Sequence, residues 1–492
     1  MPFLKKHWPL LLILTVAFLV RLLAVLQYGD FWGDEMFSFV YSQKPWLLSL
    51  TKFWIWETNP PLHLLLLKLW WYVFPATEWY ARLPSLLFGV ASVYAIYALG
   101  KKMFNQRTGI VAALLLALSP YNIFLSATTR VYALLLLLTI LSLNYFYTIF
   151  FLEQKTRWQQ IIFSVIALLL LYAHLTGLVV LALEILLVWI MRRKKIKSLF
   201  KLFLWPFLLW LPWAIPAAFS KITTPHFGQA WFFTIEQTPA SLLNAFRPLF
   251  TGLGAAYWAL LIIFIFFATT IWTMYQQRKN DRPNEAFIVL LIFSLLPLVA
   301  ALFLGLWNIK FIVFTLPTVQ LLVAYFLTTY LARWPTLIGI FCLLLVLPGL
   351  VELTFLLPLE KWSTLNKYIS TNINPAKNQL LIYSNFTDEQ RLNRYFNFSI
   401  PALPYYALTE KENWDKTIIT QNYLRIIHPL SELQNWYQAE NLKNYNDIFV
   451  LEVNTIGEIN LSKLLEQNGW HLLASPFKPH LLGDYILLHY GR

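Results

Sequence analysis

The sequence predicts a polytopic α-helical membrane protein with a small α/β domain at its carboxyl end. Only 13% of the 492 residues are charged and 58% are hydrophobic, whereas about a quarter of the residues in a soluble domain are charged. Several apolar runs reach about 20 residues, which is the length of helix that crosses ~30 Å of hydrocarbon. The long apolar runs stop near residue 354, and Asn, Glu, Lys and Tyr become more frequent after it.

Apolar segments of the predicted transmembrane domain, residues 1–354, define its spans. The first follows Lys5 and Lys6 and is interpreted as a retained span, because it exceeds a usual signal-peptide core and lacks a small-x-small cleavage site. Segment 60–74 is apolar but short and carries Lys68, so we expect an amphipathic helix at the outer interface, within a first outer loop 29–81. The eleven predicted spans are 8–28, 82–100, 109–127, 130–151, 159–174, 176–191, 199–217, 254–275, 286–306, 311–331 and 335–354.

The basic residues decide the predicted orientation. If segment 60–74 does not cross the membrane, most loop Lys and Arg residues face the cytoplasm, as the positive-inside rule requires, and if it crosses, this bias reverses. The amino terminus is therefore predicted to lie in the cytoplasm, in an inner or plasma membrane, with the carboxyl-terminal domain outside. Topology accounts for the net charge of +14, and no nucleic-acid partner is expected.

The carboxyl-terminal residues 355–492 are predicted to form a soluble extracytoplasmic α/β domain. Short, alternating apolar stretches at 379–385, 447–453 and 485–490 are typical of buried strands. The single cysteine, Cys342, lies inside an apolar run, so the sequence supports neither a disulfide framework nor a Cys-based metal site.

Polar residues from distant parts of the chain fall on one aqueous face in this topology. An interfacial anchor or a loop charge is the commoner explanation for each lone residue. Asp34 and Glu35 differ, because two adjacent carboxylates follow the first span by a few residues. They could accept a proton from a substrate, or they could start a helix, whose amino end favours acidic side chains. The shared face holds Asp34, Glu35, Asn59, His63, Arg130, His174, Arg247 and Lys310.

Five motifs occur in order over roughly residues 5–200: WGDEMFSF, NPPLHLLLLKLWW, ARLPSLLFG, LSPYNIFLSATTRVYALLLL and YAHLTG. Their order and spacing resemble the GT-C superfamily of lipid-sugar-dependent glycosyltransferases. The resemblance is to the branch of protein O-mannosyltransferases and of aminoarabinose and RgtA/B/C/D-like transferases. It implies that Asp34 is the general base with Glu35 as its partner, and that Arg130 contacts the donor phosphate. Asn59 and Lys310 depart from the family, which often has a basic residue before the proline pair and Arg-Tyr near the tenth span.

The resemblance implies an inverting glycosyltransferase that moves a hexose or pentose from a polyprenyl-phosphate donor to an extracytoplasmic lipid, glycan or protein. The chain lacks a Gly-rich nucleotide fingerprint, which agrees with such a donor. No cofactor is expected to be required and no tight metal site is predicted, although the residues permit a divalent cation at Asp34 and Glu35. The expected donor-phosphate and substrate ligands are Arg130, Asn59, His63, Tyr132, His174, Arg247 and Lys310.

A polytopic transporter or lipid flippase is the alternative function. It predicts broken helices and polar residues near the bilayer midplane. Two charged residues lie within predicted spans. Arg21 is expected to extend its guanidinium to the outer interface, whereas mid-span Glu184 has no assigned role.

Overall fold

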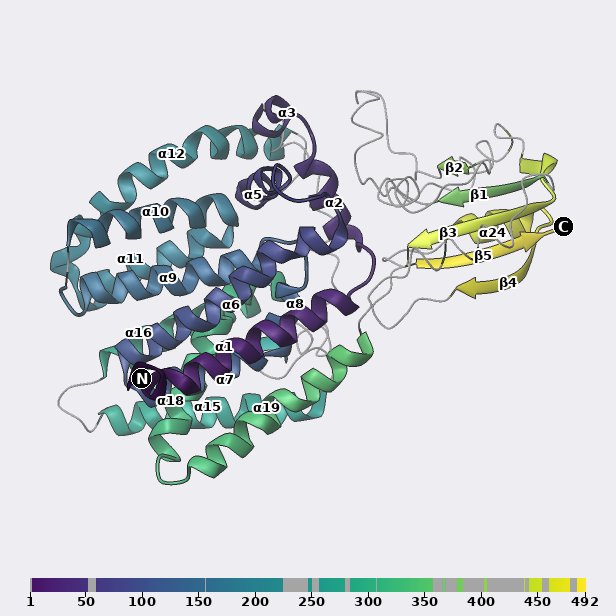
Figure 1. Cartoon of the computed structure of the whole chain (residues 1–492). Helices are drawn as coiled ribbons and strands as arrows, with labels where there is room; N and C mark the ends of the chain where they lie inside the picture. Colours follow the sequence, from purple (N-terminus) through teal and green to yellow (C-terminus); the bar gives the residue numbers. More distant parts are fainter. Residues whose placement is uncertain are drawn as a thin grey trace. The chain divides into compact units, whose positions relative to one another are not determined.

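The computed structural model contains two compact units. The first joins Met1–Gln27 to Tyr41–Phe355, and the second joins Tyr28–Val40 to Leu356–Arg492. The first unit is a bundle of helices and the second is built around a β-sheet, as Figure 1 shows. The residues that the structure describes are 2–51, 59–154, 156–223, 247–249, 256–278, 284–306, 308–356, 365, 368, 378–383, 402–404, 438, 442–453, 460–477 and 485–492.

The helices of the first unit coincide with the apolar segments of the sequence. Within the described residues, six helices are long and apolar enough to cross a membrane, and α7 with α8 forms a seventh candidate that bends by 61°. Each of the eleven predicted spans falls on a helix or a broken helix, and the number that crosses stays a prediction. The bounds are α1 (Pro2–Gln27), α6 (Glu78–Met103), α7 (Gln106–Leu118), α8 (Pro120–Ser126), α9 (Tyr132–Phe150), α10 (Arg157–Ala173), α11 (Thr176–Met191), η1 (Arg193–Lys195), α12 (Ile196–Thr223), η2 (Arg247–Leu249), α15 (Ala256–Arg278), α16 (Glu285–Phe303), α17 (Ile309–Ile312), η3 (Val313–Thr315), α18 (Leu316–Tyr330) and α19 (Pro335–Leu356).

Burial separates central from peripheral helices. The apolar windows of α9 and of the α17–α18 segment are each 78% buried, whereas those of α1 and α12 are 33% and 28% buried. The peripheral helices leave large apolar side chains uncovered, among them Leu23 on α1 and Leu204 on α12. Such a surface suits lipid rather than water. Between α6 and α7, a Cβ at Gly109 would lie 2.6 Å from the Tyr97 carbonyl oxygen, so glycine allows these two helices to approach closely.

The predicted interfacial helix appears as α5 (Leu62–Trp70). Its nine residues span about 13 Å at 1.5 Å per residue, which is too short to cross a bilayer. A second short helix, α3 (Trp46–Thr51), was not predicted from the sequence. The Trp46 indole N–H donates to the Tyr72 hydroxyl at 2.9 Å, and Leu47 and Leu69 are exposed. This apolar exterior with aromatic side chains is typical of helices that lie in a membrane interface.

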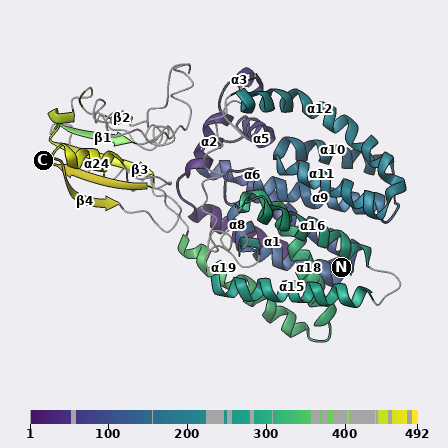
Figure 2. The same cartoon turned by 180° about the vertical axis from the view of Figure 1, so that it is seen from behind.

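The second unit contains a five-stranded sheet of order β2-β1-β3-β5-β4, with parallel pairing among the first three strands and antiparallel pairing among the last three. Figure 2 shows helix α24 lying against the sheet, where Leu464 and Leu465 are buried with Ile448 and Trp470. The bounds are α2 (Gly33–Ser42), β1 (Gln379–Tyr383), β2 (Ala402–Pro404), η5 (Leu442–Asn444), β3 (Asp447–Val453), α24 (Asn460–Gln467), β4 (His471–Phe477) and β5 (Tyr485–Gly491).

The predicted strands correspond to β1, β3 and β5, and residues 384 and 385 of the first lie outside the described residues. The sequence did not predict β2 and β4. Strand β2 has three residues, and β4 changes register twice along β5, so its side chains do not alternate regularly. The predicted outer loop 29–81 is divided, because Tyr28–Val40 belongs to the second unit.

The prediction for Arg21 is wrong. We expected the guanidinium to reach the outer interface, but the side chain is completely buried. It donates hydrogen bonds to the carbonyl oxygens of Leu116 and Ala117 at 3.1 and 2.9 Å. These carbonyls belong to the last turn of α7, where an intrahelical partner is missing. The partner of Arg21 is therefore protein backbone rather than the aqueous interface.

Glu184 is also completely buried, on α11, where the Ser142 hydroxyl of α9 donates to its Oε1 at 2.8 Å. Glu184→Gln keeps an oxygen for this hydrogen bond, so we expect thermal stability close to that of the parent protein. Glu184→Ala leaves the Ser142 hydroxyl without its acceptor and opens a cavity, which should cost about 1–3 kcal/mol. Tryptophan fluorescence during heating in detergent measures both changes. Equal stability of the Ala and Gln variants would contradict the expectation.

Candidate functional site at the ends of the bundle helices

Four basic side chains of the first unit lie near one another at helix ends. Arg130 lies in the turn between α8 and α9, His63 near the start of α5, His174 between α10 and α11, and Lys310 in α17. The positive charge of Arg130 acts on both histidines, and that of Lys310 acts on His174. The rings of Tyr132 and His174 are 5.7 Å apart between centroids. The structure thus brings together five of the predicted substrate ligands.

Arg130 is fixed through its backbone. Its amide N–H donates to the Thr128 carbonyl oxygen at 2.9 Å, and its carbonyl oxygen accepts from the Ser85 hydroxyl of α6 at 3.4 Å. Val131, the next residue, is the N-cap of α9. Arg130 is buried and directly precedes this N-cap, and both a guanidinium and the positive end of a helix dipole favour an anion.

His174 has one defined tautomer. It caps the carboxyl end of α10 with an extended backbone. The Thr176 amide N–H donates to its Nδ1 at 3.2 Å, and the Thr176 hydroxyl lies 2.8 Å from the same nitrogen. Because an amide N–H can only donate, Nδ1 is the acceptor and Nε2 carries the proton. Burial, then the charges of Arg130 and Lys310, lowers the pKa of His174 to about 3, so the ring is a neutral hydrogen-bond donor.

His63 is a second buried, neutral imidazole. Burial, then the charge of Arg130, lowers the pKa of His63 to about 3. Its Nε2 is buried and has no hydrogen-bond partner among the residues that the structure describes. An unmatched polar atom of this kind beside a cation is a position where a polar ligand atom can bind.

The two histidines make stability depend on pH. Their pKa is about 3 in the folded protein and about 6.5 in an unfolded chain. Between these values the unfolded chain binds more protons, so the free energy of unfolding falls as the pH falls from 6.5. His63→Gln removes one titrating group and should reduce this slope by up to about 1.4 kcal/mol per pH unit.

Chemical denaturation of the purified protein between pH 4 and 8 measures that slope. Comparison at pH 8, where the histidine is neutral in both states, gives the effect of the replacement itself. An unchanged slope in His63→Gln would contradict a buried, neutral His63.

The remaining predicted ligands lie around the cluster with less direct connection to it. Asn59 is half-buried, two residues before the N-cap of α5, and Arg247 is half-buried in η2, which contacts α8 and α18. The Lys310 amide N–H donates to the side chain of Asn308, the N-cap of α17, at 2.9 Å.

Asp34 and Glu35 lie in the first turn of α2, in the second compact unit. The Trp32 amide N–H donates to Glu35 Oε2 at 3.5 Å, and Glu35 is completely buried. This contact is one half of a capping box, so Glu35 has a structural role at the helix start. Asp34 is half-buried and its carbonyl oxygen accepts from the Ser38 hydroxyl. In the described part of the chain, no group of three or more metal-binding side chains occurs.

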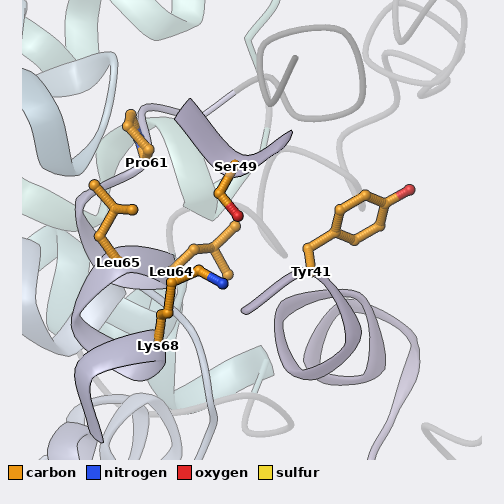
Figure 3. A pocket seen from close by; sticks show the side chains of 6 residues that line it. All are labelled: Tyr41, Ser49, Pro61, Leu64, Leu65 and Lys68. Carbon is orange, nitrogen blue, oxygen red and sulfur yellow. The ribbon is translucent and has the colours of Figure 1, made fainter. Parts of the chain in front are cut away.

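A hollow between α3 and α5 was not predicted from the sequence. In Figure 3, Lys68 and Ser49 point toward this hollow, whereas the hydroxyl of Tyr41 points away. The Lys68 ammonium donates to the Lys44 carbonyl oxygen and lies 5.1 Å from the centre of the Trp46 ring. The empty space at this hollow, open solvent included, is about 190 Å³, which is below the range of ligand pockets. Through its contacts with Lys44 and Trp46, Lys68 links α5 to the start of α3.

Residues 58–218 match the family model described as dolichyl-phosphate-mannose-protein mannosyltransferase. ArnT from Cupriavidus metallidurans in the apo state has a similar structure, with a TM-score of 0.60 and 13% identity over 99% of this chain and 98% of that chain. The same protein bound to undecaprenyl phosphate gives a TM-score of 0.59 and 12% identity over 98% of both chains. The chain has the fold of the GT-C superfamily.

A more distant GT-C structure is the archaeal oligosaccharyltransferase AglB from Archaeoglobus fulgidus, in complex with an inhibitory peptide and a dolichol-phosphate. Its TM-score is 0.52 and its identity 14%, over 91% of this chain and 70% of that chain. No curated protein sequence matches the chain. The resemblance drawn from the five motifs is confirmed, and the GT-C neighbours and apolar helices identify an integral membrane protein. The family match includes Arg130 and His174 and begins after Asp34.

Proposed function

We propose that this GT-C protein transfers a monosaccharide from a polyprenyl-phosphate donor to an acceptor at the outer face of the membrane. The observation that carries the proposal is the cluster of the buried Arg130 and the half-buried Lys310 beside two neutral histidines. Because the histidines are uncharged, the positive charge of the cluster comes from Arg130 and Lys310. Two cations beside neutral hydrogen-bonding groups suit an anionic ligand. ArnT binds undecaprenyl phosphate and AglB binds a dolichol-phosphate, and these ligands share the chemistry that the cluster would select.

The phosphate of the donor would bind first to Arg130, whose planar guanidinium matches two phosphate oxygens. Lys310 would add a point charge as negative charge grows on the leaving lipid phosphate. The His174 Nε2–H would donate to a phosphate or sugar oxygen, and the unmatched His63 Nε2 would bind a polar atom of the ligand. Neither histidine would compete for a proton at neutral pH. Tyr132, Asn59 and Arg247 would complete the substrate contacts.

Asp34 would act as the general base, with Glu35 holding the helix start that positions it. The acceptor hydroxyl or amine would give its proton to Asp34 as its oxygen or nitrogen attacks the anomeric carbon. The bond from that carbon to the phosphate oxygen breaks, and the electron pair leaves with the lipid phosphate. One displacement of this kind inverts the configuration of the sugar. No cofactor enters the step, although a divalent cation could also be held by Asp34 and Glu35.

The orientation is part of the proposal. The amino terminus would lie in the cytoplasm, and the cation cluster and carboxyl-terminal residues would face outward, where lipid-linked sugars rather than nucleotide sugars are the donors. A reporter enzyme that is active only outside the cytoplasm, fused after Arg492, should be active, and one fused before Met1 should be silent. The opposite pattern would exclude this orientation.

The test of the function uses the full-length protein in liposomes with a panel of undecaprenyl-phosphate and dolichyl-phosphate monosaccharides that carry labelled sugars. Lipid, glycan and peptide fractions serve as acceptors. We expect the label of one donor to move to one acceptor, with release of the polyprenyl phosphate. Movement of intact labelled lipid between the leaflets without sugar transfer would instead indicate the transporter alternative.

A further inference from the structure

The candidate span formed by α7 and α8 is broken after Leu118. Helix α7 ends at Leu118, Ser119 adopts an extended conformation, and Pro120 starts α8 at 61° to α7. A proline at this position removes an amide donor, and the break leaves the carbonyl oxygens of the last α7 turn without intrahelical partners. Inside a membrane protein such groups must be satisfied by other protein atoms.

Arg21 of α1 supplies those donors. Its Nη1 donates to the Ala117 carbonyl oxygen at 2.9 Å and its Nη2 to that of Leu116 at 3.1 Å. Nη1 also donates to the Ala17 carbonyl oxygen at 3.0 Å, which ties the guanidinium to its own helix. Finally, Nε donates to the Ser126 hydroxyl of α8 at 3.2 Å. One planar group thus holds α1, the end of α7 and the end of α8 in a fixed arrangement.

The surroundings of Arg21 leave little freedom for this arrangement to change. The Ser126 hydroxyl donates a hydrogen bond to the Asn122 carbonyl oxygen at 2.6 Å, so it accepts from Arg21 and donates within α8. Gly89 of α6 packs on the other side. A Cβ at Gly89 would lie 2.0 Å from the Ser126 hydroxyl oxygen and 2.9 Å from Arg21 Nε. The contacts among α1, α6 and α8 therefore close around one buried corner.

The chain continues from this buried corner to Arg130 within four residues of Ser126. Helix α8 ends at Ser126, and the Ala127 amide N–H still donates to the Ile123 carbonyl oxygen at 3.0 Å. The Thr128 hydroxyl then donates to the Leu125 carbonyl oxygen at 3.0 Å, and the Arg130 amide donates to Thr128. An unbroken series of short-range hydrogen bonds connects the corner to the residue that carries the proposed phosphate ligand.

We infer that Arg21 is a positioning residue for Arg130: by fixing the broken span, it sets the place of the guanidinium that binds the lipid phosphate. Arg21 itself does not touch the ligand. The inference rests on the proposed role of Arg130 and adds Arg21 as the residue that sets its position. A buried arginine in the first span is thereby explained by the geometry of the broken span rather than by direct contact with substrate.

Ser126→Ala is the sharpest variant, because it removes the link between Arg21 and α8 and leaves the bonds to α7. Binding of undecaprenyl phosphate to the full-length protein in nanodiscs should weaken about three- to tenfold. Ser92→Ala is the matched control, since this buried α6 hydroxyl donates only to the Phe88 carbonyl oxygen of its own helix. The control should bind as the parent protein does. Arg21→Lys should weaken binding as well, because an ammonium cannot reproduce the planar fork.

The deciding measurement repeats Ser126→Ala in an Arg130→Gln background. A positioning role acts through Arg130, so the serine change should have no further effect there. If Ser126→Ala weakens binding of undecaprenyl phosphate equally in the parent and in the Arg130→Gln background, these contacts have only a general structural role. That result would overturn the inference. If Arg130→Gln weakens binding and Ser126→Ala alone does not, the inference fails while the proposed function stands. If Arg130→Gln has no effect, the proposed phosphate site itself is wrong, and the inference falls with it.

Discussion

Asp34→Asn is expected to abolish sugar transfer and to leave binding of the polyprenyl phosphate unchanged. The amide has the shape of the carboxylate but cannot accept the acceptor's proton, and loss of general-base catalysis costs about 10²–10⁴-fold in rate. The measurement is the single-turnover rate of the purified protein with the donor and acceptor found in the panel assay. Circular dichroism and thermal unfolding verify that the variant is folded.

Asp30→Asn serves as the matched control, since Asp30 lies four residues earlier in the same segment Tyr28–Val40. It should transfer at the parent rate. Glu35→Gln should have a smaller effect than Asp34→Asn, because Glu35 caps the start of α2. Parent-like transfer by Asp34→Asn would remove Asp34 from the mechanism.

Arg130→Ala has the second largest expected effect. It should weaken binding of the donor phosphate rather than proton transfer from the acceptor. A charge-assisted hydrogen bond contributes about 1.5–3 kcal/mol, so binding of undecaprenyl phosphate should weaken about 10- to 100-fold. The same change removes a charge that lowers the pKa of His63 and His174. Both pKa values should therefore rise in the variant, and the pH dependence of stability should become shallower.

Arg157→Ala is the control for Arg130→Ala. Arg157 is exposed at the start of α10, at the opposite end of the helix from His174. In titrations with undecaprenyl phosphate, followed by native mass spectrometry, this control should bind the lipid as the parent protein does. Equal weakening in both variants would indicate a nonspecific effect of net charge, and the assignment of Arg130 would be wrong.

Periodicity and composition were sufficient to locate the long apolar helices of the first unit and three of the five strands, because apolar runs and alternation are local properties of the chain. The role of Arg21 was missed because it depends on Leu116, Ala117 and Ser126, about a hundred residues away. The angle between α7 and α8 could not be predicted either, because a proline indicates that a helix breaks but not by how much it bends.

The candidate site also has features that the sequence predicted and features that it did not. The motifs and the orientation rule placed Arg130, His174 and Lys310 on one face, and the structure brings these residues together with His63. The neutral state and tautomer of His174 could not be predicted, because they follow from burial and from the Thr176 amide. The assignment of Tyr28–Val40 to the second unit could not be predicted from the sequence either, because that unit joins segments from opposite ends of the chain.

That assignment has a consequence for biosynthesis. The segment that carries Asp34 emerges early from the ribosome, yet the rest of its compact unit begins at Leu356. At about 5–20 residues per second, synthesis of the intervening chain takes roughly 15–60 s. During this time the membrane bundle can insert while the carboxyl-terminal part of the unit that contains α2 is not yet made. A nascent or truncated chain would thus reach the membrane before the compact unit that contains Asp34 is complete.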